Sequence, residues 1–104
     1  TPDQVCILPI SDKYMEYSKE VLNSLEISDI RAEIDDRSEK TGRKIRDAEV
    51  RKIPFMLIVG EREAHEGKVS VRRHGGEDLG SMSLEEFKAL TNKEITENID
   101  EFVV

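Results

Sequence analysis

The sequence predicts an α/β domain in which helices cover a mixed sheet. Two continuous apolar runs, Val5–Leu8 and Phe55–Val59, are closed by Pro9 and Gly60. Runs of this kind are typical of strands that are buried on both faces of a sheet. Each run is joined to a segment with helical periodicity, which favours βαβ crossovers and a parallel core. The order of elements along the chain is βαβαβββα or βαβαββα.

The first helix is predicted over about residues 13–26. Ser11 and Asp12, which are types that cap helix N-termini, precede it. Apolar residues at three- and four-residue spacing then form one stripe: Tyr14, Tyr17, Val21, Leu22 and Leu25. Apolar and charged residues alternate over residues 30–34, which predicts a half-buried or edge strand.

A second helix is predicted over residues 40–51, before Pro54. At about 100° per residue, four basic residues fall on one face: Lys40, Arg43, Lys44 and Arg51. Ile45 and Ala48 fall on the opposite side. We therefore expect a helix with one exposed basic face and one narrow packing face.

The pattern changes after the second buried strand. Val69 and Val71 alternate with polar residues, and residues 74–77 supply turn types. Residues 78–82 fit either a short antiparallel strand or a loop.

A third helix is predicted to begin at Ser83, which forms a capping box with Glu86. Met82 and Phe87 stand where a hydrophobic staple would place them. The apolar residues of this helix are Leu84, Phe87, Leu90 and Ile95. The tail beyond it is polar until Phe102-Val103-Val104.

Length and composition indicate one domain without a disulfide, because 104 residues contain a single cysteine. That cysteine, Cys6, lies in an apolar strand and is interpreted as a small buried hydrophobe. A reducing, cytoplasmic setting is expected. The sequence has no run of about 18 apolar residues and no signal-peptide pattern at Thr1–Gln4, so no membrane partner is expected.

Motifs of enzyme chemistry are scarce. The sequence has no Cys-x-x-Cys, no His-Glu-x-x-His, no Gly-x-x-x-x-Gly-Lys-Ser/Thr and no Gly-x-Ser-x-Gly. His65 and His74 are interpreted as solvated residues in turns. Asp35 and Asp36 could hold a metal ion, but Arg37 can neutralise them, which favours a role in the loop or helix start.

Charge is unevenly distributed along the chain. The net charge is −7, yet residues 37–74 hold 11 Lys/Arg against 6 Asp/Glu. A basic middle between two acidic flanks is the kind of patch that attracts phosphate. The patch lacks interleaved aromatic residues, although guanidinium groups can still stack on or bind splayed bases. From the residues alone, the chain is a soluble α/β domain with a basic patch, and a solvated face without a ligand stays open.

Several ordered blocks resemble one family. Residues 36–48 and 53–63 resemble the strand–turn–helix and the Pro-containing central strand of class II aminoacyl-tRNA synthetase anticodon-binding domains. Residues 67–73 and 78–83, with Val-x-Val-Arg and Asp-Leu-Gly-Ser-Met, resemble the threonyl member in particular. The resemblance covers nearly the whole chain. It implies a mixed sheet of about five strands flanked by three helices, in agreement with the order above.

The resemblance implies recognition of the anticodon stem-loop of threonine tRNA, with no catalytic residue. It assigns Glu63 and Arg72 to the guanine of the anticodon, and places further groups near the loop: Ser38, Arg46 and Lys52. Phosphate contacts are expected from Lys40, Arg43, Lys44 and Arg51. The sequence departs from the family pattern at four places, among them Thr41, where Ile is frequent, and His74-Gly75, where some members have a basic pair. Ser38 stands where Asn is frequent, and Lys52 stands where Arg is frequent, which leaves a point charge instead of a bidentate group.

The resemblance also implies a longer parent from whose C-terminal end residues 1–104 derive as the anticodon-binding domain. That parent would be an ATP-dependent threonine–tRNA ligase, a cytoplasmic homodimer that uses ATP, magnesium and zinc in an upstream catalytic domain. No cofactor is expected in this chain itself, and its partners would be the tRNA and that catalytic domain. Two alternatives stay open: the same module from a prolyl-, glycyl- or histidyl-type synthetase, and an α/β domain that binds a small ligand or a protein.

Overall fold

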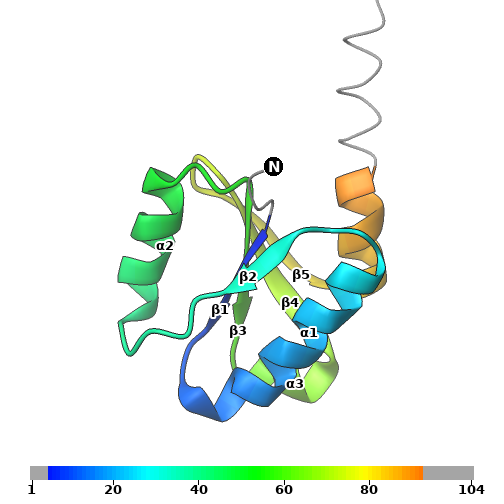
Figure 1. Ribbon diagram of the computed structural model, residues 1–104, viewed down its shortest axis with the longest axis horizontal. Helices are drawn as coiled ribbons and strands as arrows, with labels where there is room; N and C mark the ends of the chain where they lie inside the picture. Colours follow the sequence, from blue (N-terminus) through cyan, green and yellow to red (C-terminus); the bar gives the residue numbers. More distant parts are fainter. Residues whose placement is uncertain (1–4, 93–104) are drawn as a thin grey trace, which may run out of the picture.

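The computed structural model describes residues 5–92 of the chain (Figure 1). Its elements are β1 (Val5–Pro9), a 3₁₀ turn (Asp12–Tyr14), α1 (Met15–Ile27), β2 (Ala32–Ile34), α2 (Thr41–Val50), β3 (Phe55–Val59), α3 (Glu61–Glu66), β4 (Lys68–Arg73) and β5 (Glu77–Ser83). Residues 84–92 form a further helix. Thr1–Gln4, Ile95 and the Phe102-Val103-Val104 tail lie outside the described residues.

The five strands form one mixed sheet in the order β2-β1-β3-β4-β5. β1 pairs in parallel with β2 and with β3, whereas β4 pairs antiparallel with β3 and β5. The predicted parallel core of βαβ crossovers is therefore confirmed. β2 is the predicted edge strand, and residues 78–82 belong to a strand and not to a loop.

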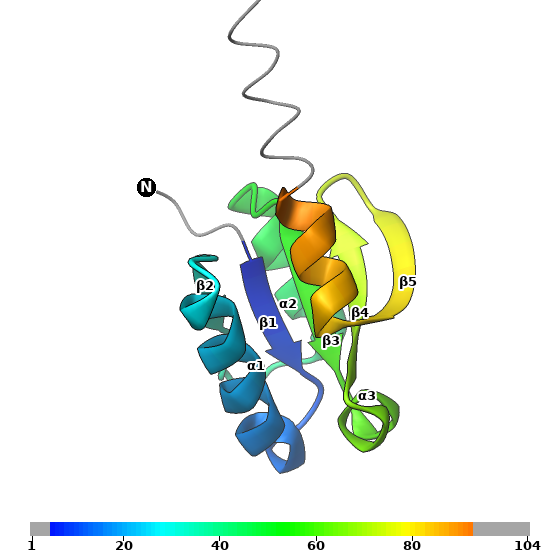
Figure 2. The same ribbon diagram turned by 90° about the vertical axis from the view of Figure 1, so that its right-hand side faces the viewer.

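Helices cover both faces of the sheet. α1 and the helix of residues 84–92 lie on one face, and α2 lies on the other, behind β1 and β3 in Figure 2. The larger core is formed with α1 by every second strand residue: Val5, Ile7, Phe55, Leu57, Val59, Val69 and Val71, with Val21, Leu25, Ile30 and Phe87. The smaller core, under α2, comprises Cys6, Leu8, Ala48, Ile53 and Met56. Both faces of β1 and β3 are thus buried, which explains their unbroken apolar sequences.

The last described helix begins as the sequence predicts. The hydroxyl oxygen of Ser83 accepts a hydrogen bond from the backbone N–H of Glu86 at 3.2 Å. Phe87 is fully buried, and its ring meets that of Phe55 edge-on, with centroids 5.4 Å apart. Among the described residues, no helix is long and apolar enough to cross a membrane.

One helix is not predicted by the sequence. α3 has no apolar stripe, since its sequence is Glu-Arg-Glu-Ala-His-Glu, so periodicity gives no signal for it. It ends at Gly67, whose φ of 70° is the left-handed conformation that favours glycine. His65 therefore lies in a helix, and the expectation that it occupies a turn is wrong.

Candidate nucleic-acid interface

Arg72 lies on the α2 side of the sheet. Its neighbours along β4, Val69 and Val71, point into the core under α1, so Arg72 and Ser70 point the other way. Across the ladder, Arg72 is paired with Met56 of β3, which belongs to the core under α2. The Nε of Arg72 is buried without a partner, and the described contacts include no ion pair of its guanidinium. Arg72 thus presents an unpaired cation on this face.

Glu63 lies at the third position of α3 and is fixed by two hydrogen bonds. Its Oε1 accepts from the backbone N–H of Gly60 at 2.7 Å, and its Oε2 accepts from the hydroxyl of Ser70 at 3.3 Å. A carboxylate offers about four lone-pair sites, so two of them stay open to a ligand. Because Ser70 and Arg72 are two residues apart on one strand, the carboxylate and the guanidinium border the same strip of sheet.

Ser70 was missed by the sequence analysis as a site residue. The alternation of β4 places Ser70 on the face of Arg72, but nothing in the sequence shows that α3 returns over this strand. The contact between Ser70 and Glu63 depends on that helix, which periodicity does not reveal.

The turn between β4 and β5 is attached to α2. Nε2 of His74 lies 3.1 Å from the backbone oxygen of Glu49, and the backbone N–H of Gly75 donates to a Glu49 carboxylate oxygen at 3.0 Å. His74 is a turn residue, as predicted, but it has these partners and is not simply solvated. The turn and α2 therefore border the open face of β4 together.

The segment between β2 and α2 carries Ser38 and Lys40, and both are exposed. Just before them, the guanidinium of Arg37 donates two hydrogen bonds to the Asp35 carboxylate, at 2.9 and 2.8 Å. These bonds hold the pKa of Asp35 below its usual value, against the opposing effect of burial. Arg37 does neutralise Asp35, in agreement with the loop interpretation of that carboxylate.

The basic face expected on α2 is only partly present. Arg43 and Arg46 are exposed, and so is Lys52, which follows the helix with a φ of 61°. Arg51 is exposed but forms an ion pair with Glu33 of β2. Within the described residues no ion pair of Lys40, Arg43, Arg46 or Lys52 is found.

Lys44 contradicts the expectation of an exposed basic residue. Its side chain is buried, with 4% of the residue exposed. Nζ donates to the backbone oxygens of Asp35 at 3.0 Å and Pro9 at 3.3 Å. The helical wheel placed Lys44 beside Arg43, but α2 tilts this residue over the carboxyl ends of β1 and β2, where two carbonyl groups need a donor.

The candidate residues fall into two groups. Ser38, Lys40 and Glu63 follow the carboxyl ends of β2 and β3, which meet at the same end of the sheet. Arg51 and Lys52 lie at the other end of α2, with Arg43 and Arg46 between. We treat them together as one candidate surface, made of the loop of residues 35–40, the exposed side of α2 and the outward-facing residues of β4.

Comparison with known proteins identifies the family. A family model described as "Anticodon binding domain" matches residues 4–94. The chain belongs to the anticodon-binding domain family. It is 52% identical over 99 residues to a threonine–tRNA ligase of Cytophaga hutchinsonii and 55% identical over 102 residues to one of Bacteroides thetaiotaomicron. These alignments cover 95% and 98% of this chain.

Solved structures agree with this assignment. The RNA-binding domain of threonyl-tRNA synthetase from Cryptosporidium parvum superposes with a TM-score of 0.81 at 26% identity, covering 89% of this chain and 24% of that one. Prolyl-tRNA synthetase from the same organism gives the same TM-score and identity, covering 92% and 21%. This anticodon-binding domain thus shares its fold with both types, while its sequence matches the threonine ligases. It spans only 15–16% of the length of the two bacterial ligases.

Proposed function

We propose that this domain recognises the anticodon loop of threonine tRNA, and that Glu63 and Arg72 read its guanine. The observation that carries the proposal is the unpaired guanidinium of Arg72 on the face of β4 where Ser70, two residues away, bonds the fixed carboxylate of Glu63. The match to threonine–tRNA ligases at about half identity supports threonine tRNA as the partner.

Guanine suits the pair chemically. Its N1–H and N2–H₂ groups donate, which fits the two open lone-pair sites on the Glu63 carboxylate. Its O6 and N7 accept, which fits the guanidinium of Arg72. Each good bidentate contact of this kind contributes about 1–3 kcal/mol of discrimination against another base. Adenine would present an amino group and no N1–H, and would leave part of the site unpaired.

The exposed cations would position the loop. Lys40, Arg43 and Arg46 line one side of the surface without ion pairs in the described part of the chain, so they suit phosphate oxygens. Lys52 lies nearer the turn between β4 and β5, with Ser38 at the opposite end. Arg51, already paired with Glu33, would have to exchange that partner before it bound phosphate.

The longer protein would be a threonine–tRNA ligase. In that proposal, threonine activation, ATP, magnesium and zinc belong to a catalytic domain outside this chain, the protein is a cytoplasmic homodimer, and this domain delivers the tRNA to the catalytic domain. The relatives' names support the ligase activity, and their greater length supports the further domains.

Binding to anticodon stem-loops tests the proposal. The threonine stem-loop and a copy with the guanine replaced by adenine are titrated against the wild type, Arg72→Ala and Glu63→Gln. We expect the wild type to prefer the guanine loop and both variants to lose most of that preference. Arg62→Ala is the matched control, because Arg62 is an exposed arginine of α3 whose side chain is 80% exposed.

The outcomes separate the alternatives. Equal affinity for both loops in the wild type would refute the assignment of Glu63 and Arg72 to guanine. The proline, glycine and histidine stem-loops are titrated in the same way, and preference for one of them would assign the domain to a different synthetase. No binding at low salt would favour a domain for a small ligand or a protein.

A further inference from the structure

Two cations near the carboxyl end of β2 are engaged in contacts within the protein: Lys44, which is buried, and Arg37, which is exposed. Lys44 bonds the last residue of β1, through Pro9 O, and the residue after β2, through Asp35 O. One ammonium group on α2 thereby links the ends of two parallel strands. A buried ammonium is costly unless its donors are satisfied, and here two of its three have carbonyl partners.

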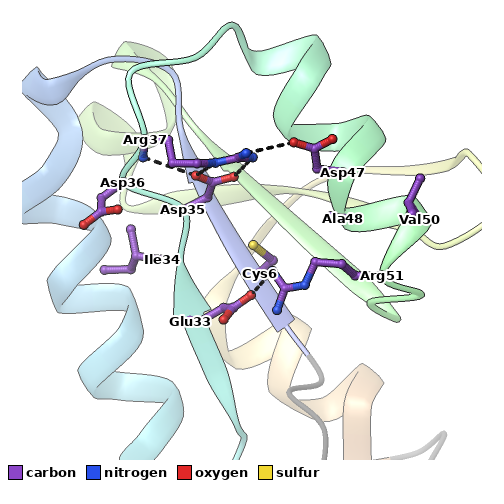
Figure 3. A pocket seen from close by; sticks show the side chains of 10 residues that line it. All are labelled: Cys6, Glu33, Ile34, Asp35, Asp36, Arg37, Asp47, Ala48, Val50 and Arg51. Carbon is purple, nitrogen blue, oxygen red and sulfur yellow. Dashed lines mark hydrogen bonds and ion pairs between the residues drawn. The ribbon is translucent and has the colours of Figure 1, made fainter.

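Arg37 makes a second link to the same helix. Besides its two bonds to the Asp35 carboxylate, its Nη1 lies 2.9 Å from an oxygen of Asp47 on α2 (Figure 3). The backbone N–H of Arg37 also donates to Asp35, at 3.2 Å. The loop that leaves β2 is therefore attached to α2 through both a backbone carbonyl and a side-chain carboxylate.

These links lie on both sides of the segment that carries Ser38 and Lys40, two residues of the proposed site. Ser38 follows Arg37 directly, and Lys40 is the N-cap residue of α2, where its carbonyl accepts from the N–H of Lys44 at 3.1 Å. Within the part of the chain that the structure describes, the side chains of Ser38 and Lys40 form no hydrogen bond or ion pair, so their positions depend on the backbone between Asp35 and Lys44.

We propose that Lys44 and Arg37 are positioning residues that hold the segment of Ser38 and Lys40 in place for the anticodon loop, and that neither binds phosphate. This inference rests on the proposed function, because it assigns the two residues a part in the same site. The sequence pattern grouped Lys44 with the exposed cations and assigned it to phosphate contact. The proposal instead gives this buried side chain a positioning role.

Salt dependence distinguishes positioning from phosphate contact. A lysine that neutralises a phosphate contributes about one unit to the slope of log affinity against log salt concentration. We compare Lys44→Met, which keeps the length of the stem, and Arg37→Gln with Lys40→Met, an exposed cation of the same segment. Each variant is titrated with the threonine stem-loop over a series of salt concentrations.

We expect Lys44→Met and Arg37→Gln to weaken binding about fivefold with the wild-type salt slope, because each removes hydrogen bonds that order the segment. Lys40→Met should lower the slope by about one. In the Lys44→Met background, Ser38→Ala should reduce the affinity for the stem-loop by less than it does in the wild type. The reason is that a misplaced Ser38 already makes less contact with the loop. Preference for guanine over adenine, read by Glu63 and Arg72, should persist in both positioning variants.

A measurement without tRNA tests the links themselves. Amide hydrogen exchange should speed up in both variants at Asp35, whose N–H donates to Ile7 O at 2.9 Å, and at Glu39, whose N–H donates to Arg37 O at 2.9 Å. Arg37 is at the surface, so Arg37→Gln remains folded even if Lys44→Met does not.

The results distinguish the two proposals. Unchanged exchange in both variants would overturn the positioning role whether or not tRNA binds. A slope lowered by about one in Lys44→Met would make Lys44 a phosphate ligand and would equally overturn it. If the wild type does not bind the stem-loop, the proposed function is refuted, and so is the role of the links in reading an anticodon. Faster exchange in the variants would in that case show only that the links order the segment.

Discussion

Glu63 turns back along its own helix, so that its Oε1 accepts from the backbone N–H of Gly60 at 2.7 Å. This contact satisfies a donor that the start of α3 would otherwise leave without a partner. The helix has only six residues, too few for it to be stable without such contacts. The residue that we assign to guanine is thus also the residue that holds the turn after β3.

Removing this carboxylate should destabilise the fold as well as the site. We expect Glu63→Ala to lower the free energy of unfolding by about 1 kcal/mol, in the range measured for helix caps. Glu63→Gln should cost less, because its amide oxygen can still accept from Gly60. Urea unfolding measures both, with Glu66→Ala as the control in the same helix, where only an exposed contact to Arg62 is lost. Equal losses at positions 63 and 66 would contradict the capping role.

Gly60 lies at a close approach between two turns. A Cβ at this position would lie 2.8 Å from Cδ1 of Ile10 and 3.1 Å from Oε1 of Glu63. The Ile10 side chain is about half exposed and can rotate away, whereas Glu63 would have to give up its cap. We expect Gly60→Ala to cost about 1–3 kcal/mol, as overpacking does.

A double-mutant cycle tests which contact matters. If Ile10 is the main obstacle, Ile10→Ala should recover part of the loss caused by Gly60→Ala, as chemical denaturation would show. The single variant Ile10→Ala should have a small effect, since Ile10 is 48% exposed. A fully additive double variant would instead place the cost on Glu63.

The sequence predicted the fold where side-chain patterns were strong. The two apolar runs became β1 and β3, and the stripe from Tyr14 to Leu25 became the core face of α1. Residues 78–82 could not be resolved between strand and loop, because Gly80 and the polar residues there carry little strand signal. The short helix α3 was not predicted because it has no apolar stripe, and the contact that stabilises it is the cap formed by Glu63 on the Gly60 N–H.

The candidate site was predicted less well, because the geometry of a single helix does not show which other elements pack against each of its residues. The wheel grouped Lys44 with Lys40 and Arg43 by angle, but burial depends on the strand ends beneath α2. Similarly, the pairing of Arg51 with Glu33 requires β2 to lie beside α2, a contact between segments that periodicity cannot give. The roles of Glu63 and Arg72 came from family resemblance, and they stay predictions.

The ionisation of Asp35 should make the free energy of unfolding depend on pH in the acidic range. The hydrogen bonds from Arg37 lower the pKa of this carboxyl in the folded state. The folded state therefore gains from ionised Asp35 above the unfolded pKa of about 4, and this gain is lost as the pH falls through the lower, folded pKa. Asp35→Asn should reduce stability at pH 7, and the difference from the wild type should shrink on acidification. The free energy of unfolding from about pH 2 to about pH 7, a range that brackets the unfolded pKa of about 4, measures this.

The control for this prediction is Asp36→Asn. Asp36 is adjacent and exposed, and no ion pair of its side chain is found within the described residues. That variant should follow the wild-type pH dependence. A constant difference between Asp35→Asn and the wild type over the whole range would show that Arg37 does not favour the ionised form.

Cys6 should be inert until the domain unfolds. Burial, with smaller contributions from the negative charges of Glu33 and Asp35, raises the pKa of its thiol to about 12. The residue is 2% exposed on the α2 side of β1 (Figure 3). The thiolate is the reactive form, so alkylation by iodoacetamide at mildly alkaline pH should be far slower than that of a free thiol. The rate should rise with urea in step with unfolding measured by circular dichroism.

The same shift predicts a loss of stability at alkaline pH. Because the thiol ionises more readily in the unfolded chain, its contribution to stability is complete below the unfolded pKa of 9.0 and is lost as the pH rises toward the folded pKa of about 12. Cys6→Ala removes this contribution, so its stability should fall less steeply than that of the wild type above pH 9.0. Rapid alkylation in the absence of urea would mean that the space between β2 and α2 opens in the folded state. The contacts of Arg37 with α2 and of Lys44 with the strand ends would then be too weak to hold the loop beside them.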